Sequence, residues 1–285
     1  MARIGVQAMM LKDSVAEIGA FETLRRVSEI GYRAIEVSQI PMVEANVAQL
    51  ERARDELGIE VAALSAGLTA SPGGNDSLED DLDKIVADSR RLGTEMVRIG
   101  MLPFDAMGSL ERVLDFCDRT DAYARRLAES GIRLYYHNHH VEFARFDGRL
   151  MLDIIADRAP NVGLELDVHW LQRGGVNPVS VIEQYAGRVR MVHLKDYRIG
   201  RMPDSAFESL AKGDIAGFMT AFGGVVQFGE VGEGNLDFAA IIPASIASGA
   251  EYLLVEQDDL YGRTVWDALQ TSHDNLVALG FADLF

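Results

Sequence analysis

One local pattern recurs along the chain and restricts its fold more than any other feature. A stretch with helical periodicity ends in glycine, and a charged residue and a short apolar run follow within three positions. The pattern occurs at six glycines, namely Gly31, Gly58, Gly93, Gly131, Gly187 and Gly249. Glycine directly after a helix supplies the left-handed conformation that ends it. Short apolar runs rich in β-branched or aromatic residues are typical of buried strands, so the repeat predicts consecutive β/α units.

Counting the apolar runs gives eight predicted strands, at residues 4–7, 34–38, 61–65, 96–100, 133–137, 162–167, 189–194 and 252–256. Most are spaced by roughly 25 to 37 residues, as a strand with its crossover helix requires. Eight such units in 285 residues predict an α/β fold, a (β/α)₈ TIM barrel. A doubly wound sheet is the alternative, but the first strand lacks a glycine-rich nucleotide-binding fingerprint after it.

The connection between the seventh and eighth strands is extended, because the spacing from residue 194 to residue 252 is about twice the usual one. It contains a helical pattern at 204–222 and a VVQF run at 225–228. We expect a short strand or a lid over the barrel mouth here, and a ninth strand is the alternative. No linker or low-complexity segment interrupts the chain, so residues 1–285 are expected to form a single domain.

Charge and cysteine content limit the classes of partner. Lys and Arg number 27 and Asp and Glu number 44, which gives a formal net charge of −17. Such an acidic surface repels nucleic acid and anionic membranes, although a local basic pocket could still hold a small anion. Cys117 is the single cysteine and falls in a helical pattern, which indicates a reducing, cytoplasmic setting. The N-terminus is typical of a first strand rather than a signal peptide, and no stretch is apolar enough to span a membrane.

Polar side chains gather where the predicted strands end. They are Glu36, Ser38, Ser65, Arg98, His137, His139, Asp167, His169, His193, Lys195, Glu256 and Asp258. In TIM barrels this C-terminal face carries the chemistry. Asp167, His193 and Glu256 each follow directly on an apolar run, so they should point into the mouth and converge.

Carboxylates that converge in this way repel one another unless a divalent cation neutralises them. Two or three carboxylates with one imidazole suit Mn²⁺, Mg²⁺ or Co²⁺ better than a structural zinc, and Zn²⁺ remains an alternative. Taken singly, such residues are more often helix caps, surface charges or hydrogen-bonding core histidines. Their alignment around one rim favours a metal site.

Several of these segments together resemble the xylose isomerase-like TIM barrels, specifically the sugar phosphate isomerase/epimerase superfamily. The segments are YHNHHVEF at 136–143, LELDVHWLQRGGVNP at 164–178, RVRMVHLKD at 188–196, GEVGEGNLDF at 229–238 and LLVEQDD at 253–259. The opening IGVQAMML also fits, so the likeness covers nearly the whole chain.

The resemblance implies one divalent cation held by Glu, Asp, His and Glu from strands five to eight. Asp167, His193 and Glu256 match three of these positions. Many relatives place the strand-five ligand in a Glu-x-His pattern that reads His137-Asn138-His139 here. We therefore predict that Glu142 reaches back as the fourth ligand, and direct ligation by His137 is the alternative.

The resemblance also implies a small carbohydrate substrate and an isomerase or epimerase that works through a metal-stabilised enediolate. Glu142 and Glu256 are the candidate bases, and His139 is the candidate acid because its ordinary pKa lies near neutrality. His137, Trp170 and Lys195 are the predicted substrate-binding residues. Arg198 and Arg201 could anchor a phosphate or be solvated loop charges, so phosphorylation of the substrate stays open. A homo-oligomer is expected from the family alone.

Three other functions compete with this prediction. A lyase, a dehydratase or a keto-glycoside-cleaving enzyme of the same superfamily would use the same metal and the same first proton transfer. An endonuclease would need a basic DNA-binding face, which the net charge of −17 opposes. A non-catalytic barrel would require a broken ligand set, and the set of candidates is intact.

Overall fold

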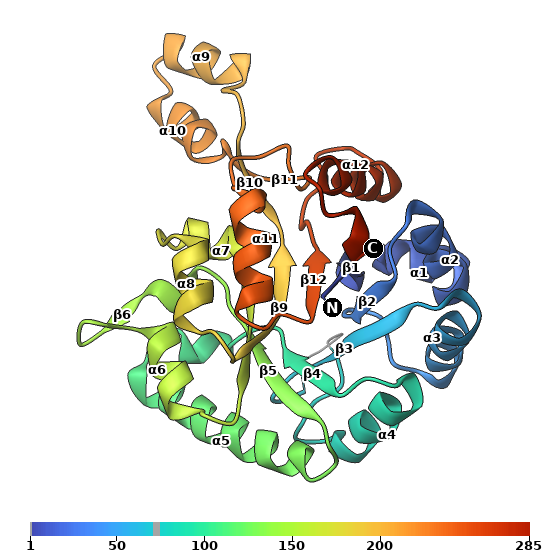
Figure 1. Ribbon diagram of the computed structural model, residues 1–285. Coiled ribbons are helices and arrows are strands. Elements are labelled where there is room, and N and C mark those ends of the chain that lie inside the picture. The colour runs from blue at the N-terminus through green and yellow to red at the C-terminus, as the bar shows by residue number, and fades with distance from the viewer. Residues whose placement is uncertain (1, 71–74) are drawn as a thin grey trace.

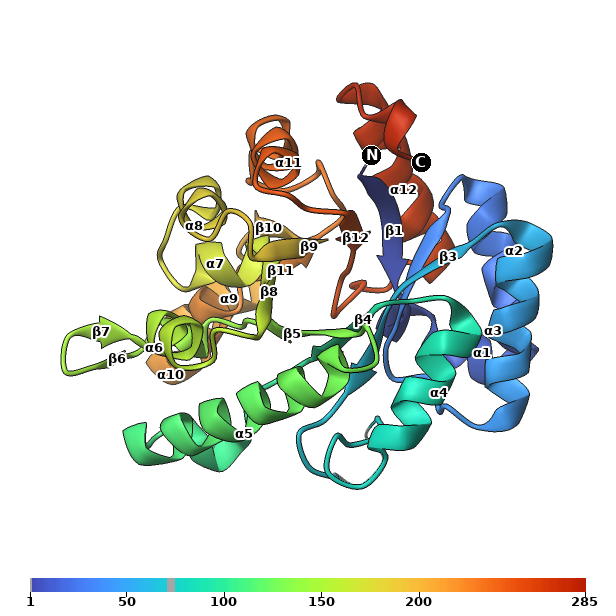
Figure 2. The ribbon, with the colours of Figure 1, turned by 60° about the horizontal axis from the view of Figure 1, so that its bottom comes forward.

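Eight parallel strands close into a barrel in the computed structural model, which describes residues 2–70 and 75–285. Around the barrel the order is β1, β12, β9, β8, β5, β4, β3, β2, and each strand is followed along the chain by at least one helix (Figures 1 and 2). The strands are β1 (Arg3–Gln7), β2 (Ala34–Val37), β3 (Glu60–Ala66), β4 (Met96–Ile99), β5 (Arg133–His137), β8 (Gly163–Asp167), β9 (Val189–Leu194) and β12 (Tyr252–Val255). The predicted TIM barrel and its eight strand positions are confirmed.

Most of the helices surround the barrel, and six of them are followed within three residues by a glycine of the repeat. They are α1 (Lys12–Ile18), α2 (Ala20–Ile30), α3 (Glu44–Leu57), α4 (Leu82–Leu92), α5 (Leu110–Ala128), α6 (Met151–Arg158), α7 (Val168–Arg173), α8 (Pro178–Gln184), α9 (Asp204–Ala211), α10 (Ile215–Gly223), α11 (Phe238–Ala247) and α12 (Val265–Ala278). Short 3₁₀ turns are η1 (Ala8–Leu11), η2 (Phe104–Ala106), η3 (Val141–Phe143) and η4 (Ala282–Leu284). All six glycines of the repeat have positive φ, from 68° at Gly58 to 132° at Gly31. No described helix has the length and hydropathy to cross a membrane.

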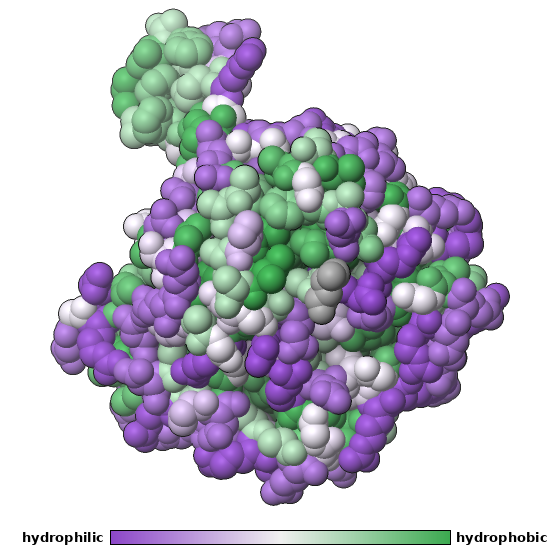
Figure 3. Space-filling view, viewed as in Figure 1, coloured by the Kyte–Doolittle hydropathy of each residue, from purple (hydrophilic) through white to green (hydrophobic). Residues whose placement is uncertain are grey.

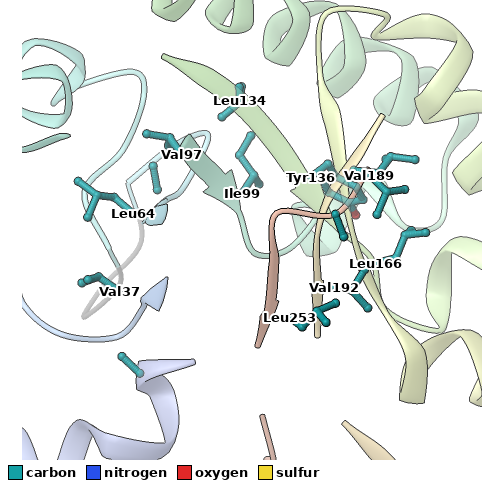
Figure 4. Packing of buried hydrophobic residues seen from close by; sticks show 14 of the residues in the cluster. Val37, Leu64, Val97, Ile99, Leu134, Tyr136, Leu166, Val189, Val192 and Leu253 are labelled. Atoms are coloured by element: carbon teal, nitrogen blue, oxygen red, sulfur yellow. The ribbon is translucent and has the colours of Figure 1, made fainter. Parts of the chain in front are cut away.

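The barrel strands bury both faces, but the two faces differ in chemistry. Their outer faces pack against the helices through a large apolar core (Figure 4). The inner face has only a small apolar cluster, which includes Met96, Tyr135, Met191 and Leu254. Successive side chains on a strand alternate between faces, so the residues two positions later also point inward. Those residues are Arg98, His137, His193 and Glu256, which makes the C-terminal half of the interior charged.

The long connection between β9 and β12 leaves the barrel instead of adding a strand to it. β10 (Asp196–Ile199) and β11 (Val226–Gly229) form an antiparallel ribbon outside the barrel, so the VVQF run is a strand but not a ninth barrel strand. Beyond the ribbon, α9 and α10 project away from the barrel (Figure 1). Their exposed surface is largely apolar (Figure 3) and includes Phe207, Ile215, Met219 and Phe222. A second ribbon, β6 (Arg145–Phe146) with β7 (Arg149–Leu150), was not anticipated from the sequence.

We predict that Gly5→Ala destabilises the barrel. A Cβ on Gly5 would lie 2.5 Å from the carbonyl oxygen of Ala34 and 2.8 Å from its Cβ. This contact would push β2 away from β1, and overpacking of this kind costs about 1–3 kcal/mol. Urea denaturation should show a lower free energy of unfolding for the variant. Gly108→Ala is the control, because a Cβ there meets no atom within 4 Å. Equal stabilities for the two variants would contradict the prediction.

Candidate metal centre and active site

Four side chains from consecutive positions around the barrel meet at its C-terminal mouth. His137, Asp167, His193 and Glu256 can each offer one ligand atom so that all four atoms lie within 4.8 Å of one another. All four residues are at most 4% exposed. His137 Nε2, Asp167 Oδ2, His193 Nδ1 and Glu256 Oε2 each lack a hydrogen-bond partner of acceptable geometry among the described residues. Convergent, buried imidazole nitrogens and carboxylate oxygens are the donor atoms that a divalent cation requires.

His137 is held with one ring nitrogen toward this cluster. Its Nδ1 lies 3.2 Å from the carbonyl oxygen of Gly100. A carbonyl oxygen only accepts hydrogen bonds, so this bond forms in the tautomer that carries its proton on Nδ1. Nε2 is then free and lies 3.5 Å from Asp167 Oδ2. Burial, followed by the charge of His193, lowers the pKa of His137 to about 4. His137 is therefore neutral at pH 7, as a metal-ligating imidazole must be.

A second group of buried charges orients His193. Its Nε2 lies 3.0 Å from Glu36 Oε2 and 3.1 Å from Glu165 Oε1, which leaves Nδ1 facing Asp167 and Glu256. Arg98 is 2.6 Å from Glu36 and 3.5 Å from Glu165. Burial alone would lower the pKa of His193, but the carboxylates of Glu165, Glu256 and Glu36 raise it well above its ordinary value. Carboxylates behind a ligating histidine fix which nitrogen faces the metal.

Glu142 does not join the cluster. It lies on η3. One carboxylate oxygen accepts a hydrogen bond from the hydroxyl of Tyr136, and the other accepts one from the backbone N–H of His139 at 2.8 Å. Tyr136 points to the outer face of β5, where it packs on Phe116 of α5, opposite to His137. The hydrogen bond to Tyr136 thus holds Glu142 away from the interior. Burial raises the pKa of Glu142. The geometry favours the alternative in which His137 takes the strand-five position.

Lys195 inserts its ammonium among the carboxylates. Nζ lies 3.0 Å from Asp167 Oδ2, 2.9 Å from Glu256 Oε2 and 2.8 Å from Asp258 Oδ2, and the side chain is 1% exposed. Burial alone would lower the pKa of Lys195, yet the three carboxylates raise it, so the residue stays charged. Lys195 is a buried partner of the cluster and not a solvated rim residue.

A cavity of about 510 Å³ opens above the cluster, within the range of small-molecule sites. His137, His139, Lys195, Glu256 and Asp258 border it on one side. The lining also includes amide, hydroxyl and apolar side chains, namely Gln7, Ser38, Gln39, Asn75, Met9, Leu68, Met101, Leu102 and Phe104. None of the described residues of 196–229 borders this cavity, so the expected lid over the mouth is not seen.

Two predicted site residues have surroundings that alter their roles. Burial, then the charge of His137, lowers the pKa of His139 to about 2, which opposes its prediction as a protonated acid. Trp170 packs against His139, with 5.3 Å between the ring centroids, and also against Phe228 of β11. It is not among the described residues that border the cavity. His140 is exposed, stacks on Trp170 and lies outside the cluster.

Two further residues of the site were not identified from the sequence. Gln7 ends β1 and donates to Glu256 Oε1 at 3.0 Å. Glu165 faces the interior two positions before Asp167, and the alternation of the strand could have revealed it. Burial and the neighbouring carboxylate of Glu36 raise the pKa of Glu165 to about 8.

Comparison with known proteins agrees with this architecture. The family model of the xylose isomerase-like TIM barrel matches residues 24–264. The chain belongs to this family. Among proteins with curated descriptions, no sequence matches it significantly.

Solved structures of the same fold cover nearly the whole chain. A sugar phosphate isomerase/epimerase from Parabacteroides distasonis is 18% identical, with a TM-score of 0.71 over 99% of this chain and 96% of that one. An L-ribulose 3-epimerase is 20% identical, with a TM-score of 0.67 over 100% and 96%. A probable 3-DHS dehydratase from Bacillus anthracis is 14% identical, with a TM-score of 0.65 over 97% and 99%. At these identities the likeness establishes the fold and leaves the reaction to be argued from the site.

We predict that His137→Ala abolishes stoichiometric binding of a divalent cation, whereas Glu142→Gln retains it. The imidazole supplies one of four converging donor atoms, and the carboxylate of Glu142 bonds Tyr136 and His139 instead. Metal analysis after EDTA treatment and reconstitution checks both variants, with circular dichroism as the control for folding. Loss of metal from Glu142→Gln alone would restore the assignment made from the sequence.

We predict that binding of the cation releases about one proton per protein near pH 6–7, because ligating imidazoles must be neutral. His193 has a raised pKa and carries a proton in this range without the cation. The affinity should therefore rise with increasing pH. Titration calorimetry in two buffers of different ionisation enthalpy measures the proton count. Binding without proton release would show that His193 is already neutral or is not a ligand.

Proposed function

We propose that the protein is a divalent-metal-dependent enzyme that moves a proton at a carbon beside the carbonyl of a sugar, as an isomerase or epimerase. The observation that supports this most strongly is the convergence of His137, Asp167, His193 and Glu256 beneath a ligand-sized cavity. The structural neighbours include epimerases, which is in keeping with the proposal but does not carry it.

The donor set decides which cation fits best. The sequence suggested up to three carboxylates and one imidazole, but the cluster has two carboxylates and two imidazoles. Imidazole nitrogen moves the preference away from Mg²⁺ and toward Mn²⁺, Co²⁺ or Zn²⁺. When bound, such a cation supplies Lewis acidity, which acidifies the C–H bond beside a carbonyl.

Two carboxylates at the cavity can receive the proton. Lys195 and His193 overcome the effect of burial and lower the pKa of Glu256, so it is ionised at neutral pH. Asp258 lies 2.8 Å from Lys195 Nζ, and burial raises its pKa. A general base works best when its pKa is near the working pH, so Asp258 is better matched than Glu256. We therefore add Asp258 to the candidate bases.

Lys195 links the two carboxylates. Its ammonium contacts both Glu256 and Asp258 and borders the cavity, so it can stabilise negative charge that develops on a substrate oxygen. The neutral imidazole of His139 is left to donate or accept a hydrogen bond at a substrate hydroxyl. Trp170 supports His139 from behind.

A lyase or dehydratase is the second candidate, and one observation favours it. Epimerisation through two bases requires proton acceptors on both faces of the substrate. Glu142 was predicted as one of them but bonds Tyr136 on the outer face of β5. The remaining carboxylates, Glu256 and Asp258, share one side of the cavity with Lys195. A base beside a cationic acid on one side is an arrangement suited to elimination.

We predict that the Mn²⁺-loaded protein catalyses deuterium incorporation beside the carbonyl of ketoses in D₂O, observed by ¹H NMR. Asp258→Asn should lower kcat by about 10²–10⁴-fold, the usual contribution of a general base, with metal content unchanged. Asp259→Asn is the matched control, because the Asp259 carboxylate accepts only the backbone N–H of Tyr261 among its side-chain bonds to described residues.

The products separate the two candidates. An epimer or isomer supports the first, and an unsaturated or dehydrated product supports the second. Absence of exchange with every ketose tested would contradict the proposed function. Full exchange in Asp258→Asn would leave Glu256 as the base.

A further inference from the structure

The cations at the cavity are already engaged by the protein. Among the described residues that border the cavity, Arg98 and Lys195 are the only Lys or Arg side chains. Arg98 pairs with Glu36 and Glu165. Lys195 contacts three carboxylates between 2.8 and 3.0 Å. Both side chains are thus already paired with carboxylates, so neither brings an uncompensated charge to a phosphate dianion.

The summed charge of the buried groups also disfavours binding of a phosphate group. Five carboxylates surround the cationic side chains of Arg98, Lys195 and His193, namely Glu36, Glu165, Asp167, Glu256 and Asp258. A divalent cation at the cluster would not make this set positive. A phosphate ester with its two negative charges would enter a site that offers no electrostatic gain to offset the loss of its hydration.

A cradle of backbone amides after the seventh barrel strand is also filled. Many TIM barrels bind phosphate through backbone amides in the loops after strands seven and eight. Here, after the seventh strand β9, the Asp196 carboxylate accepts four backbone N–H groups, from Tyr197 at 2.7 Å, Gly232 at 2.9 Å, Gly234 at 2.8 Å and Leu236 at 3.2 Å. A Cβ on Gly234 would collide with this carboxylate. An anion of the protein itself thus occupies a cradle of amides that could hold an external anion.

The two arginines of the neighbouring loop, Arg198 and Arg201, do not provide a phosphate-binding site at the cavity either. Arg198 lies 3.6 Å from Glu230 and 4.0 Å from Glu233, so it is paired within the ribbon region. Arg201 is exposed, and neither arginine borders the cavity. The phosphate anchor considered from the sequence is therefore not built by these residues.

We propose that the natural substrate is an uncharged sugar that carries no phosphate. The inference rests on the proposed function, because it concerns the same cavity. The amides of Gln7, Gln39 and Asn75 and the hydroxyl of Ser38 can bind sugar hydroxyls. Met9, Met101 and Phe104 form an apolar wall for the C–H face of the ring. A neutral sugar binds without an unpaired Lys or Arg side chain, so it fits a cavity in which Arg98 and Lys195 are already paired with carboxylates.

Paired probes test the inference on the full, Mn²⁺-loaded chain. D-fructose and D-tagatose are each compared with their 6-phosphates, and inorganic phosphate is added alone at about 1 mM, with binding read from the rise in Tm. We expect at least one neutral ketose to bind about tenfold more tightly than its phosphate, a difference of ~1.4 kcal/mol. We expect no rise in Tm with inorganic phosphate. Tighter binding of a 6-phosphate, a Tm rise with inorganic phosphate, or failure of both neutral ketoses to bind would each overturn the inference.

Deuterium exchange in the same samples separates this inference from the proposed function. A neutral ketose that binds without exchange supports the inference and contradicts the function. Exchange of a 6-phosphate in preference to its neutral partner supports the function and overturns the inference.

The filled amide cradle has its own test. Asp196→Ala removes the internal anion, so the variant should gain a Tm rise with inorganic phosphate that the parent protein lacks. Glu233→Gln is the control, because it removes one charge from the same loop without freeing the amides. A folded Asp196→Ala protein that still ignores phosphate would contradict the anion-cradle interpretation. If that variant does not fold, the paired ketoses still decide the inference.

Discussion

The compensation of buried charge inside the barrel is the constraint on which the site depends. Glu36, Glu165 and Asp167 are fully buried, and an unpaired ion in such a place costs several kcal/mol. Arg98, His193 and Lys195 enter the same space from β4 and from the end of β9 and offset that cost. Because each cation has to satisfy more than one carboxylate, the side-chain directions are tightly restricted. The orientation of His193 toward the candidate metal-binding cluster follows from its pairing with Glu36 and Glu165.

Most of the fold could be predicted because the signals that determine it are local. Gly58 and Gly93 end helices through a left-handed φ that other residues rarely adopt, and each is read from one position. The alternation of side chains on a parallel strand then places Asp167, His193 and Glu256 on the inner face without knowledge of distant contacts. Cyclic closure of the barrel brings these three together. This part of the candidate site needed only strand positions and the two-residue period.

The remainder depended on contacts that no local pattern specifies. Glu142 follows β5 after the alternation has ended, and its direction is decided by the hydroxyl of Tyr136 on the opposite face of the strand. The paths of α9 and α10 away from the barrel are set by the β10–β11 pairing, which joins segments separated by a long insertion. Asp196 lies next to Lys195 in sequence, yet it binds amides in a distant loop. In each case the deciding partner is remote in sequence or on another face.

The presence of His137 in the cluster, at the end of β5, affects the electrostatics of the whole cavity. A neutral imidazole there leaves Asp167 and Glu256 as the carboxylates of the candidate ligand set, and Lys195 already contacts both. A divalent cation held by this set would repel the ammonium group of Lys195, and Asp258 reduces that repulsion because it adds a third carboxylate beside Lys195. The charges are thus balanced locally before any substrate arrives. A site in this state favours a neutral sugar whose charge develops only during the reaction, when Lys195 and the cation can stabilise it.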